Sequence, residues 1–316
     1  MPLEPFFASG QTPVDLNNLF IGSAHPKELV EEAQVKGFPR NICTWIKGLY
    51  PVTRDMGSVV GVVRGDCSNT ESLLGTLRSE GLRTHAFSYP FDRDRTALEA
   101  EIGSLCDFLG CSMEDARRSA PEVERLRSLA REVDALRWDG LRVSSEDAHR
   151  VQVSTSDLGS DPDQWEADVK GVIEKGRSSP RSDDGIRLAY IGVPPIITNL
   201  FTRLEELNGR VVLFEVERQF TMPYPEEDWL GKYLRYTFPY DVESRVKDIE
   251  RELERRRISG VIHYVQSFCH RQIDDMVFRH DLDIPILTIE GNLPGPADER
   301  TLIRLESFLD MLGGMA

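Results

Sequence analysis

The five cysteines are the residues of this sequence best suited to metal or redox chemistry, and they are scattered along the chain. Their number is odd, and thiols stay reduced in the cytosol, so a framework of disulfides is not expected. No CxxC pair of the kind that marks zinc ribbons is present, since even Cys106 and Cys111 are too far apart. A metal site must therefore be assembled by the fold from positions distant in sequence.

Cys67 and Cys269 occupy equivalent places in a repeated sequence pattern. Cys67 ends the β-branched run VVGVVRGDC, Cys269 ends GVIHYVQSFC, and a helical segment follows each of them. The pattern predicts that both lie at the carboxyl end of a parallel strand, where open α/β sheets bind their ligands. A helix N-terminus there favours the thiolate by roughly 0.3–1 kcal/mol. Buried packing thiols fit the same pattern, so it leaves a shared site and two core residues equally open.

Cys43 lies in FPRNICTWIKGLYP, before the first predicted strand, and by itself is better explained as a buried thiol beside Trp45. Cys43 becomes a candidate metal ligand only in combination with Cys67 and Cys269. Three thiolates are too few to close a tetrahedral zinc site, but they suit a [4Fe–4S] cluster that leaves one iron for a non-cysteine ligand. We interpret Cys106 and Cys111, which lie among aliphatic residues of a predicted helix, as packing residues.

Strands that alternate with helices predict an α/β fold with parallel sheets. We expect two flavodoxin- or Rossmann-like domains, an N-terminal one at residues 1–180 and a C-terminal one at residues 185–316. The polar run RSSPRSDDG is the best linker between them. A charged helical segment at 94–150 is expected to be inserted between the sheets, and the charged helix at 242–257 is expected to be solvated.

Several polar residues at predicted strand ends are candidates for chemistry. Ser68 and Asn69 are expected first to cap the helix after Cys67, and second to contact a cluster or substrate. His270 is suited to a hydrogen bond to cluster sulfur or to proton transfer, although a solvated histidine at a helix start is as good an explanation. Glu290, at the end of its strand, is a candidate general base or a partner of another site residue.

Three further residues are candidates for binding a substrate. Gly192 and Val193 follow a strand, where backbone N–H groups can bind a phosphate or a thioester oxygen. The plain interpretation of the same residues is a strand-to-helix turn. Arg304 is suited to an anionic ligand, but surface ion pairing explains it equally well.

Composition excludes several classes of partner. The net charge of −15 over 316 residues argues against a nucleic-acid or anionic-membrane surface. No apolar run approaches the roughly 18–20 residues that span a bilayer. The N-terminus lacks the basic start and apolar stretch of a secretory signal, so we expect a cytoplasmic protein.

An ordered set of motifs resembles one known family. The pieces are NICTWIK, GDCSNT, YIGVPP, GVIHYVQSFCH and the tail ILTIEGNLPGPADERTLIRLESFLDML. The tail is the most specific, with Glu290, Arg304, Glu306 and Phe308 at the family's spacing. In these motifs the chain resembles the cluster-bearing subunits of the 2-hydroxyacyl-CoA dehydratase and benzoyl-CoA reductase family. The similarity covers most of the chain and is weakest between Asp94 and Gly185.

The resemblance implies one oxygen-sensitive [4Fe–4S] cluster between two flavodoxin-like domains, held by Cys43, Cys67 and Cys269. It implies an enzyme of anaerobes, a lyase or a reductase, that performs low-potential one-electron chemistry on an acyl-CoA substrate. In the dehydratases, one electron makes a ketyl radical that expels the hydroxyl group. The implied partners are a separate ATP-hydrolysing iron–sulfur activator protein and a sister subunit or a second copy of the chain. The sequence has no GxxxxGK[ST] motif of its own.

The chain looks shorter than the usual dehydratase subunits, chiefly at the N-terminus and in the middle, and alternatives therefore stay open. One is a small-molecule reductase or a maturation redox protein on the same scaffold, which predicts either a larger cluster that includes Cys106 or Cys111 or a pocket too small for CoA. Another is an electron-carrying subunit without a substrate. A third is a metal-free α/β protein whose cysteines are packing residues.

Overall fold

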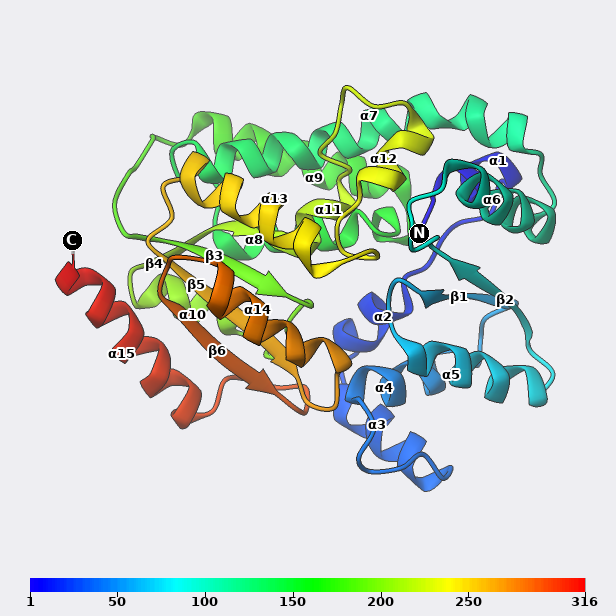
Figure 1. The fold of residues 1–316 in the computed structure, drawn as a ribbon, viewed down its shortest axis with the longest axis horizontal. Helices are drawn as coiled ribbons and strands as arrows, with labels where there is room; N and C mark the ends of the chain where they lie inside the picture. The colour runs from blue at the N-terminus through cyan, green and yellow to red at the C-terminus, as the bar shows by residue number, and fades with distance from the viewer. Residues whose placement is uncertain (316) are drawn as a thin grey trace. The chain divides into compact units, whose positions relative to one another are not determined.

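Figure 1 shows the computed structural model, which describes residues 1–315 as helices, parallel strands and connecting loops. The predicted α/β fold with parallel sheets is confirmed. The chain forms two compact units, each made of segments that are separated in sequence: unit 1 from Met1–Arg127, Ser156–Pro162 and Met222–Asp241, and unit 2 from Ser128–Thr155, Asp163–Thr221 and Val242–Ala316. The predicted domain boundary near residues 180–185 stays a prediction.

Unit 1 is built around one parallel strand–helix–strand unit. Its strands β1 (Ser58–Arg64) and β2 (Arg83–Ser88) pair in parallel and are joined by α5 (Ser68–Ser79). The leucines of α5 recur at helical spacing and pack against β1 and α4 (Thr44–Val52), forming the core of this unit. Its other elements are α1 (Glu4–Ser9), α2 (Leu16–Gly22), α3 (Pro26–Val35), α6 (Arg95–Leu109), the first part of α7 (Met113–Trp138), η1 (Leu158–Ser160) and α12 (Trp229–Arg235).

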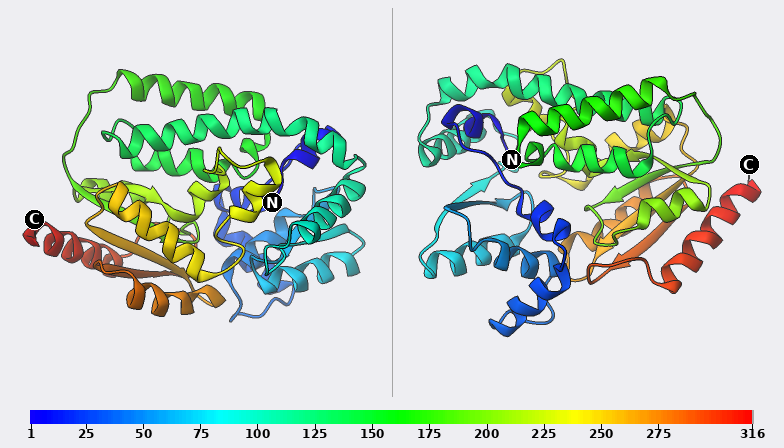
Figure 2. Two further views of the ribbon diagram at one scale, coloured as in Figure 1. Left: turned by 45° about the horizontal axis from the view of Figure 1, so that its top comes forward. Right: turned by 180° about the vertical axis from the view of Figure 1, so that it is seen from behind.

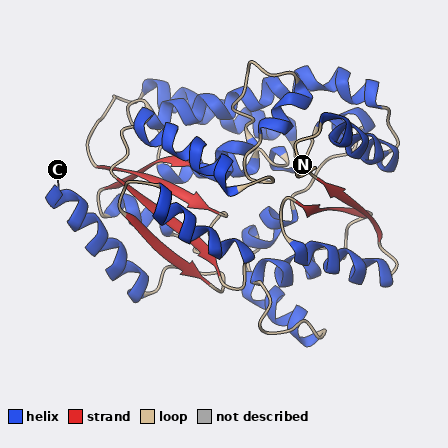
Figure 3. Cartoon of the chain, viewed as in Figure 1, coloured by secondary structure: helices blue, strands red, loops and turns tan. Residues whose placement is uncertain are grey.

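Unit 2 contains a four-stranded parallel sheet in the order β4-β3-β5-β6 (Figure 3). The strands are β3 (Ile186–Gly192), β4 (Gly209–Phe214), β5 (Gly260–Gln266) and β6 (Ile286–Gly291). Numbered within the unit, the order is 2-1-3-4, which is the beginning of the flavodoxin-like order. The order reverses between β3 and β5, so the carboxyl ends of these strands are where such a sheet binds a ligand.

Helices cover both faces of the sheet of unit 2. On one face, which Figure 1 shows in front, lie α13 (Val242–Arg255) and α14 (Asp274–Asp281). Their apolar residues form one core cluster with alternate residues of β3. The other face carries α10 (Leu200–Glu206) and α15 (Glu299–Met315), of which α10 is seen clearly from behind in Figure 2. This two-sided burial explains the continuous apolar runs of β3 and β5. The remaining elements are the rest of α7, α8 (Ser145–Ser154), α9 (Pro162–Ser178), α11 (Glu215–Phe220) and η2 (His270–Ile273).

One local prediction was wrong, that of the residue that caps the helix after Cys67. Elsewhere, the apolar run RVVLFEVE is a strand only as far as Phe214, and α11 begins at Glu215, whose buried carboxylate is held by an arginine of α13. The helix after Cys67 is not capped by Ser68 or Asn69. Cys67 itself occupies the N-cap position, and Ser68 is the first residue of α5.

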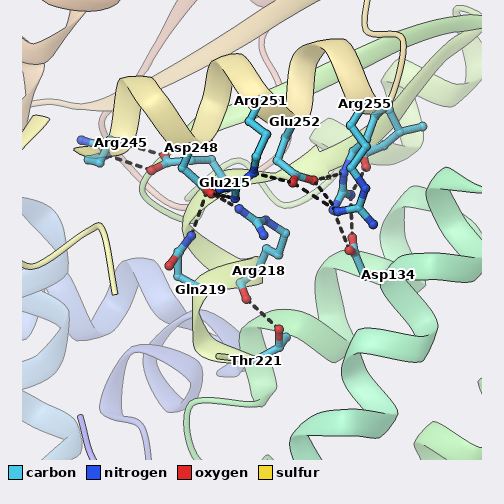
Figure 4. A network of polar contacts seen from close by, with 12 residues as sticks. Asp134, Glu215, Arg218, Gln219, Thr221, Arg245, Asp248, Arg251, Glu252 and Arg255 are labelled. Atoms are coloured by element: carbon cyan, nitrogen blue, oxygen red, sulfur yellow. Dashed lines mark hydrogen bonds and ion pairs between the residues drawn. The ribbon is translucent and has the colours of Figure 1, made fainter. Parts of the chain in front are cut away.

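The expectation that α13 is solvated was right only for its outer face, because the charges on its inner face are buried. On the inner face, Arg218 pairs with Asp248 (Figure 4). Arg256, directly after α13, donates hydrogen bonds of 2.8 and 2.7 Å to the two carboxylate oxygens of Asp134. A buried charge is tolerated when it is paired and hydrogen-bonded, and these partners come from α7 and α11. Four charged side chains of this segment are at most 5% exposed: Arg245, Asp248 and Glu252 of α13, and Arg256 directly after it.

Candidate functional site

Each of the three predicted cluster cysteines stands at the N-cap of a helix. Cys43 precedes α4, Cys67 precedes α5, and Cys269 precedes η2. The predicted placement of Cys67 and Cys269 between a strand and a helix is thereby confirmed. Cys43 shares the N-cap position, although it follows a loop rather than a strand. In the described chain, none of the three side chains accepts a cap hydrogen bond from its helix.

The N-cap position of Cys43 was missed because α4 was not predicted. The signal was present in TWIKGLYPV, where apolar residues recur three and four positions apart after Thr44. The helix is nine residues long and buries most of its surface. Its first turn therefore presents backbone N–H groups next to a buried sulfur.

In unit 2, the ends of β5 and β6 bring Glu290 close to the segment that carries Cys269. The two strands pair in register with Val265 opposite Glu290, and the amide of Ser267 donates to the carbonyl of Gly291 at 2.8 Å. The Ser267 hydroxyl donates a 2.6 Å hydrogen bond to Oε1 of Glu290. Glu290 is exposed, so its second carboxylate oxygen faces solvent or a ligand. Its role as a base or as a partner of another site residue stays a prediction.

Gly192 ends β3 in a conformation that fits glycine. Its φ is 98°, and a Cβ atom would lie 2.2 Å from the carbonyl oxygen of Tyr264. Its N–H donates to the buried carboxylate of Glu215 at 3.2 Å, and the carbonyl of Val193 accepts a 2.7 Å hydrogen bond from Tyr190. These groups thus fix the turn after β3; substrate binding by this turn stays a prediction.

The other predicted polar residues lie at the surface. Ser68 and His270 are exposed, each at the first position of its helix. Arg304 is exposed on α15 and donates a 2.7 Å hydrogen bond to the carbonyl of Thr288 in β6. This contact holds α15 against the edge of the sheet. The roles of these residues in binding or proton transfer stay predictions.

Sequence reasoning missed an arginine next to the same edge of unit 2. Arg245 of α13 forms two hydrogen bonds of 2.9 Å with Glu215 and one of 2.7 Å with Asp274. Burial alone would raise the pKa of Glu215, but Arg245 overcomes this and holds that pKa below its ordinary value. Arg245 also interacts electrostatically with Cys269. Its partners lie about 30 positions away in sequence, so no local pattern indicated the site.

Cys106 and Cys111 have the environment of packing residues. Cys106 is 1% exposed and contacts the sulfur of Met113 at 3.9 Å. The thiol of Cys111 donates to the carbonyl of Pro5 at 3.4 Å. Burial raises the pKa of Cys106 to about 12, so this thiol keeps its proton and is a poor metal ligand.

The family model of the 2-hydroxyglutaryl-CoA dehydratase D-component matches residues 1–312. The chain belongs to this family. The resemblance seen in the sequence motifs is therefore confirmed over nearly the whole chain. No curated protein was found to match the chain. In residues 1–315 of this dehydratase component, no helix is long and apolar enough to cross a membrane.

The donor chemistry of the three cysteines in this family member fits an iron–sulfur cluster better than a hard metal ion. Among the described residues, no group of three or more His, Cys, Asp or Glu side chains is placed to hold a metal ion. Cys43 and Cys67 belong to unit 1, and Cys269 belongs to unit 2. Thiolates at helix N-termini are the soft, anionic donors that an iron–sulfur cluster requires.

Proposed function

We propose that this chain, a 2-hydroxyacyl-CoA dehydratase-type subunit, binds one [4Fe–4S] cluster through Cys43, Cys67 and Cys269. The supporting observation is that all three cysteines occupy the N-cap position of a helix, in a chain that belongs to the dehydratase family. A bound cluster would supply low-potential electrons one at a time to a CoA thioester.

The protein's own groups would prepare this site in two ways. Helix N-termini stabilise thiolates by roughly 0.3–1 kcal/mol each, which lowers the free energy needed to deprotonate the ligands. At the edge of unit 2, Ser267 orients one carboxylate oxygen of Glu290 and leaves the other available. Glu290 is the residue best placed there to accept a proton from a substrate.

The proposed partners follow from membership of the family. We propose that electrons come from a separate ATP-hydrolysing iron–sulfur activator, as the resemblance implies, and the sequence contains no GxxxxGK[ST] motif of its own for binding nucleotide phosphates. The matching family is a component of a dehydratase, and we propose a sister subunit or a second copy of this chain as the other component. A cytoplasmic location follows from this set of partners.

A larger cluster, as in a small-molecule reductase on the same scaffold, is less well supported. It would recruit Cys106 or Cys111, and the buried, protonated thiol of Cys106 opposes this. The two cysteines therefore provide matched controls for the three proposed ligands.

Anaerobic reconstitution of the full chain with iron and sulfide tests the proposal. The wild type should bind about four iron and four sulfide ions per chain, as a single cubane does. Cys43→Ser, Cys67→Ser and Cys269→Ser should each lose most of this iron, whereas Cys106→Ser and Cys111→Ser should keep it. Dehydratase activity is tested by adding an activator and a 2-hydroxyacyl-CoA and following loss of water by mass spectrometry. A wild-type chain without iron would rule out the cluster.

A further inference from the structure

Lys47 is a buried ammonium group that lacks the carboxylate such a group normally has. Its side chain is 2% exposed, and its Nζ donates one hydrogen bond, of 3.2 Å, to the carbonyl oxygen of Arg40. Within the described residues, no Asp or Glu forms an ion pair with it. The other buried lysine, Lys232, is 6% exposed and is paired with Glu124 at 2.5 Å. A buried charge without a counter-charge is strongly unfavourable, so we expect a negatively charged group to lie next to Lys47 in the functional protein.

The negative partner that the fold offers to Lys47 is the sulfur of Cys43. The two residues are four positions apart across the first turn of α4, so their side chains lie on the same helix face. Burial lowers the pKa of Lys47, and the negative charge of Cys43 is the interaction that opposes this shift. Cys43 is itself buried, at 6% exposure, so water screens the interaction little.

Two further donors lie beside this pair. Thr44 is fully buried, and its hydroxyl has no hydrogen-bond partner among the described residues. The indole N–H of Trp45 is likewise buried without an acceptor in the described chain. The ring of Phe20 packs edge-on against Trp45 at 5.5 Å between centroids and fills the space next to Gly48. Packing therefore holds these donors in a fixed place, and an anionic group with several acceptor atoms would satisfy them.

We propose that Lys47 is the buried counter-charge of the anionic iron–sulfur group held by Cys43, and that Thr44 and Trp45 donate hydrogen bonds to it. Three thiolates and a cubane carry net negative charge, which grows by one on reduction. Lys47 therefore acts as a positioning residue that favours the reduced form. This inference rests on the proposed cluster. It predicts that the NICTWIK segment not only supplies one ligand but also stabilises the charge of the cluster.

The test compares Lys47→Met, Lys47→Arg and the control Lys232→Met in the full chain, both metal-free and anaerobically reconstituted. In reconstituted protein, Lys47→Met should make the reduction potential more negative or lower the iron content. Lys47→Arg should keep the potential and the iron content of the wild type. Lys232→Met should leave the potential unchanged. In metal-free protein, Lys47→Met should raise the melting temperature, because it removes a buried charge that no carboxylate balances among the described residues and that a single thiol offsets only in part. Removal of a merely structural lysine would lower it.

The outcomes separate this inference from the proposed function. A wild-type chain that binds no iron overturns the cluster, and the role of Lys47 with it. A wild type with four iron ions, next to a Lys47→Met variant with the same iron content and potential, overturns the role of Lys47 alone. A lower melting temperature of metal-free Lys47→Met also overturns it, because Lys47 would then stabilise the fold without the cluster.

Discussion

Arg245 donates two hydrogen bonds of 2.9 Å to the carboxylate of Glu215, and both residues are 1% exposed. The pair joins α13 to the start of α11, directly after β4. Glu215 also accepts the N–H of Gly192 at the end of β3. One buried ion pair thus fixes the ends of two neighbouring strands at the edge where α/β sheets bind ligands.

Replacing Arg245 by methionine should destabilise the protein by about 3–5 kcal/mol, because it leaves Glu215 as an unpaired buried charge. The double variant Arg245→Met/Glu215→Met should recover a large part of that loss, since both charges are then removed. Urea unfolding followed by circular dichroism measures both values. Equal losses in the single and double variants would contradict this account of the pair.

The strand-end cysteines could be predicted because the pattern that places them is local. A β-branched run followed by a helical segment identifies the positions of Cys67 and Cys269, and pairing partners are not needed. The position of Cys43 required α4, a short helix whose interior Pro51 obscures the helical pattern.

The charged face of α13 could not be predicted, for a physical reason. A run such as VESRVKDIERELER has the same sequence whether its charges face water or face partners from α7 and α11. The partner of Arg256 in the core, Asp134, is 122 positions away, and only tertiary structure brings them together. The proposed role of Lys47 could not be predicted for the same reason. Only the three-dimensional structure shows that this buried lysine has no carboxylate partner among the described residues.

Substitution of Glu290 tests the proposed proton transfer. Glu290→Gln should keep the iron content but lower the rate of water loss from a 2-hydroxyacyl-CoA by roughly 10²–10⁴-fold, the usual contribution of a general base. Ser267→Ala should lower it by about tenfold, since a single hydrogen bond contributes about 0.5–1.5 kcal/mol. Glu306→Gln, which alters another exposed carboxylate of unit 2, is the control. A Glu290→Gln variant with the full rate would assign the base elsewhere.

Gly192→Ala should destabilise unit 2 by at least about 1–3 kcal/mol, the usual cost of a residue held in a strained backbone conformation. The φ of 98° is unfavourable for alanine, and the new methyl group would overlap the carbonyl oxygen of Tyr264. Gly171→Ala is the control, because Gly171 lies within α9 with open space around it, and alanine there should stabilise the helix. Thermal unfolding of the two variants should shift in opposite directions.

Glu217 should make the stability of unit 2 depend on pH. The side chain is fully buried on α11, and neither carboxylate oxygen has a hydrogen-bond partner among the described residues. The ring of His149 lies beside it, with Nδ1 at 3.4 Å from Oε1 of Glu217. Burial raises the pKa of Glu217 above its ordinary value of about 4.5, although His149 opposes the shift.

A carboxyl group whose pKa is raised by folding binds its proton more tightly in the folded state than in the unfolded state. Its stabilising effect is therefore complete below pH 4.5 or so and is lost as the pH rises through the folded-state pKa. Glu217→Gln removes this loss and should stabilise the protein at pH 8 relative to pH 5, by about 1.4 kcal/mol for each unit by which folding raises the pKa of Glu217. The gain should shrink towards pH 5, as measured by urea unfolding across that range. A gain that stays constant with pH would show that Glu217 is already neutral throughout.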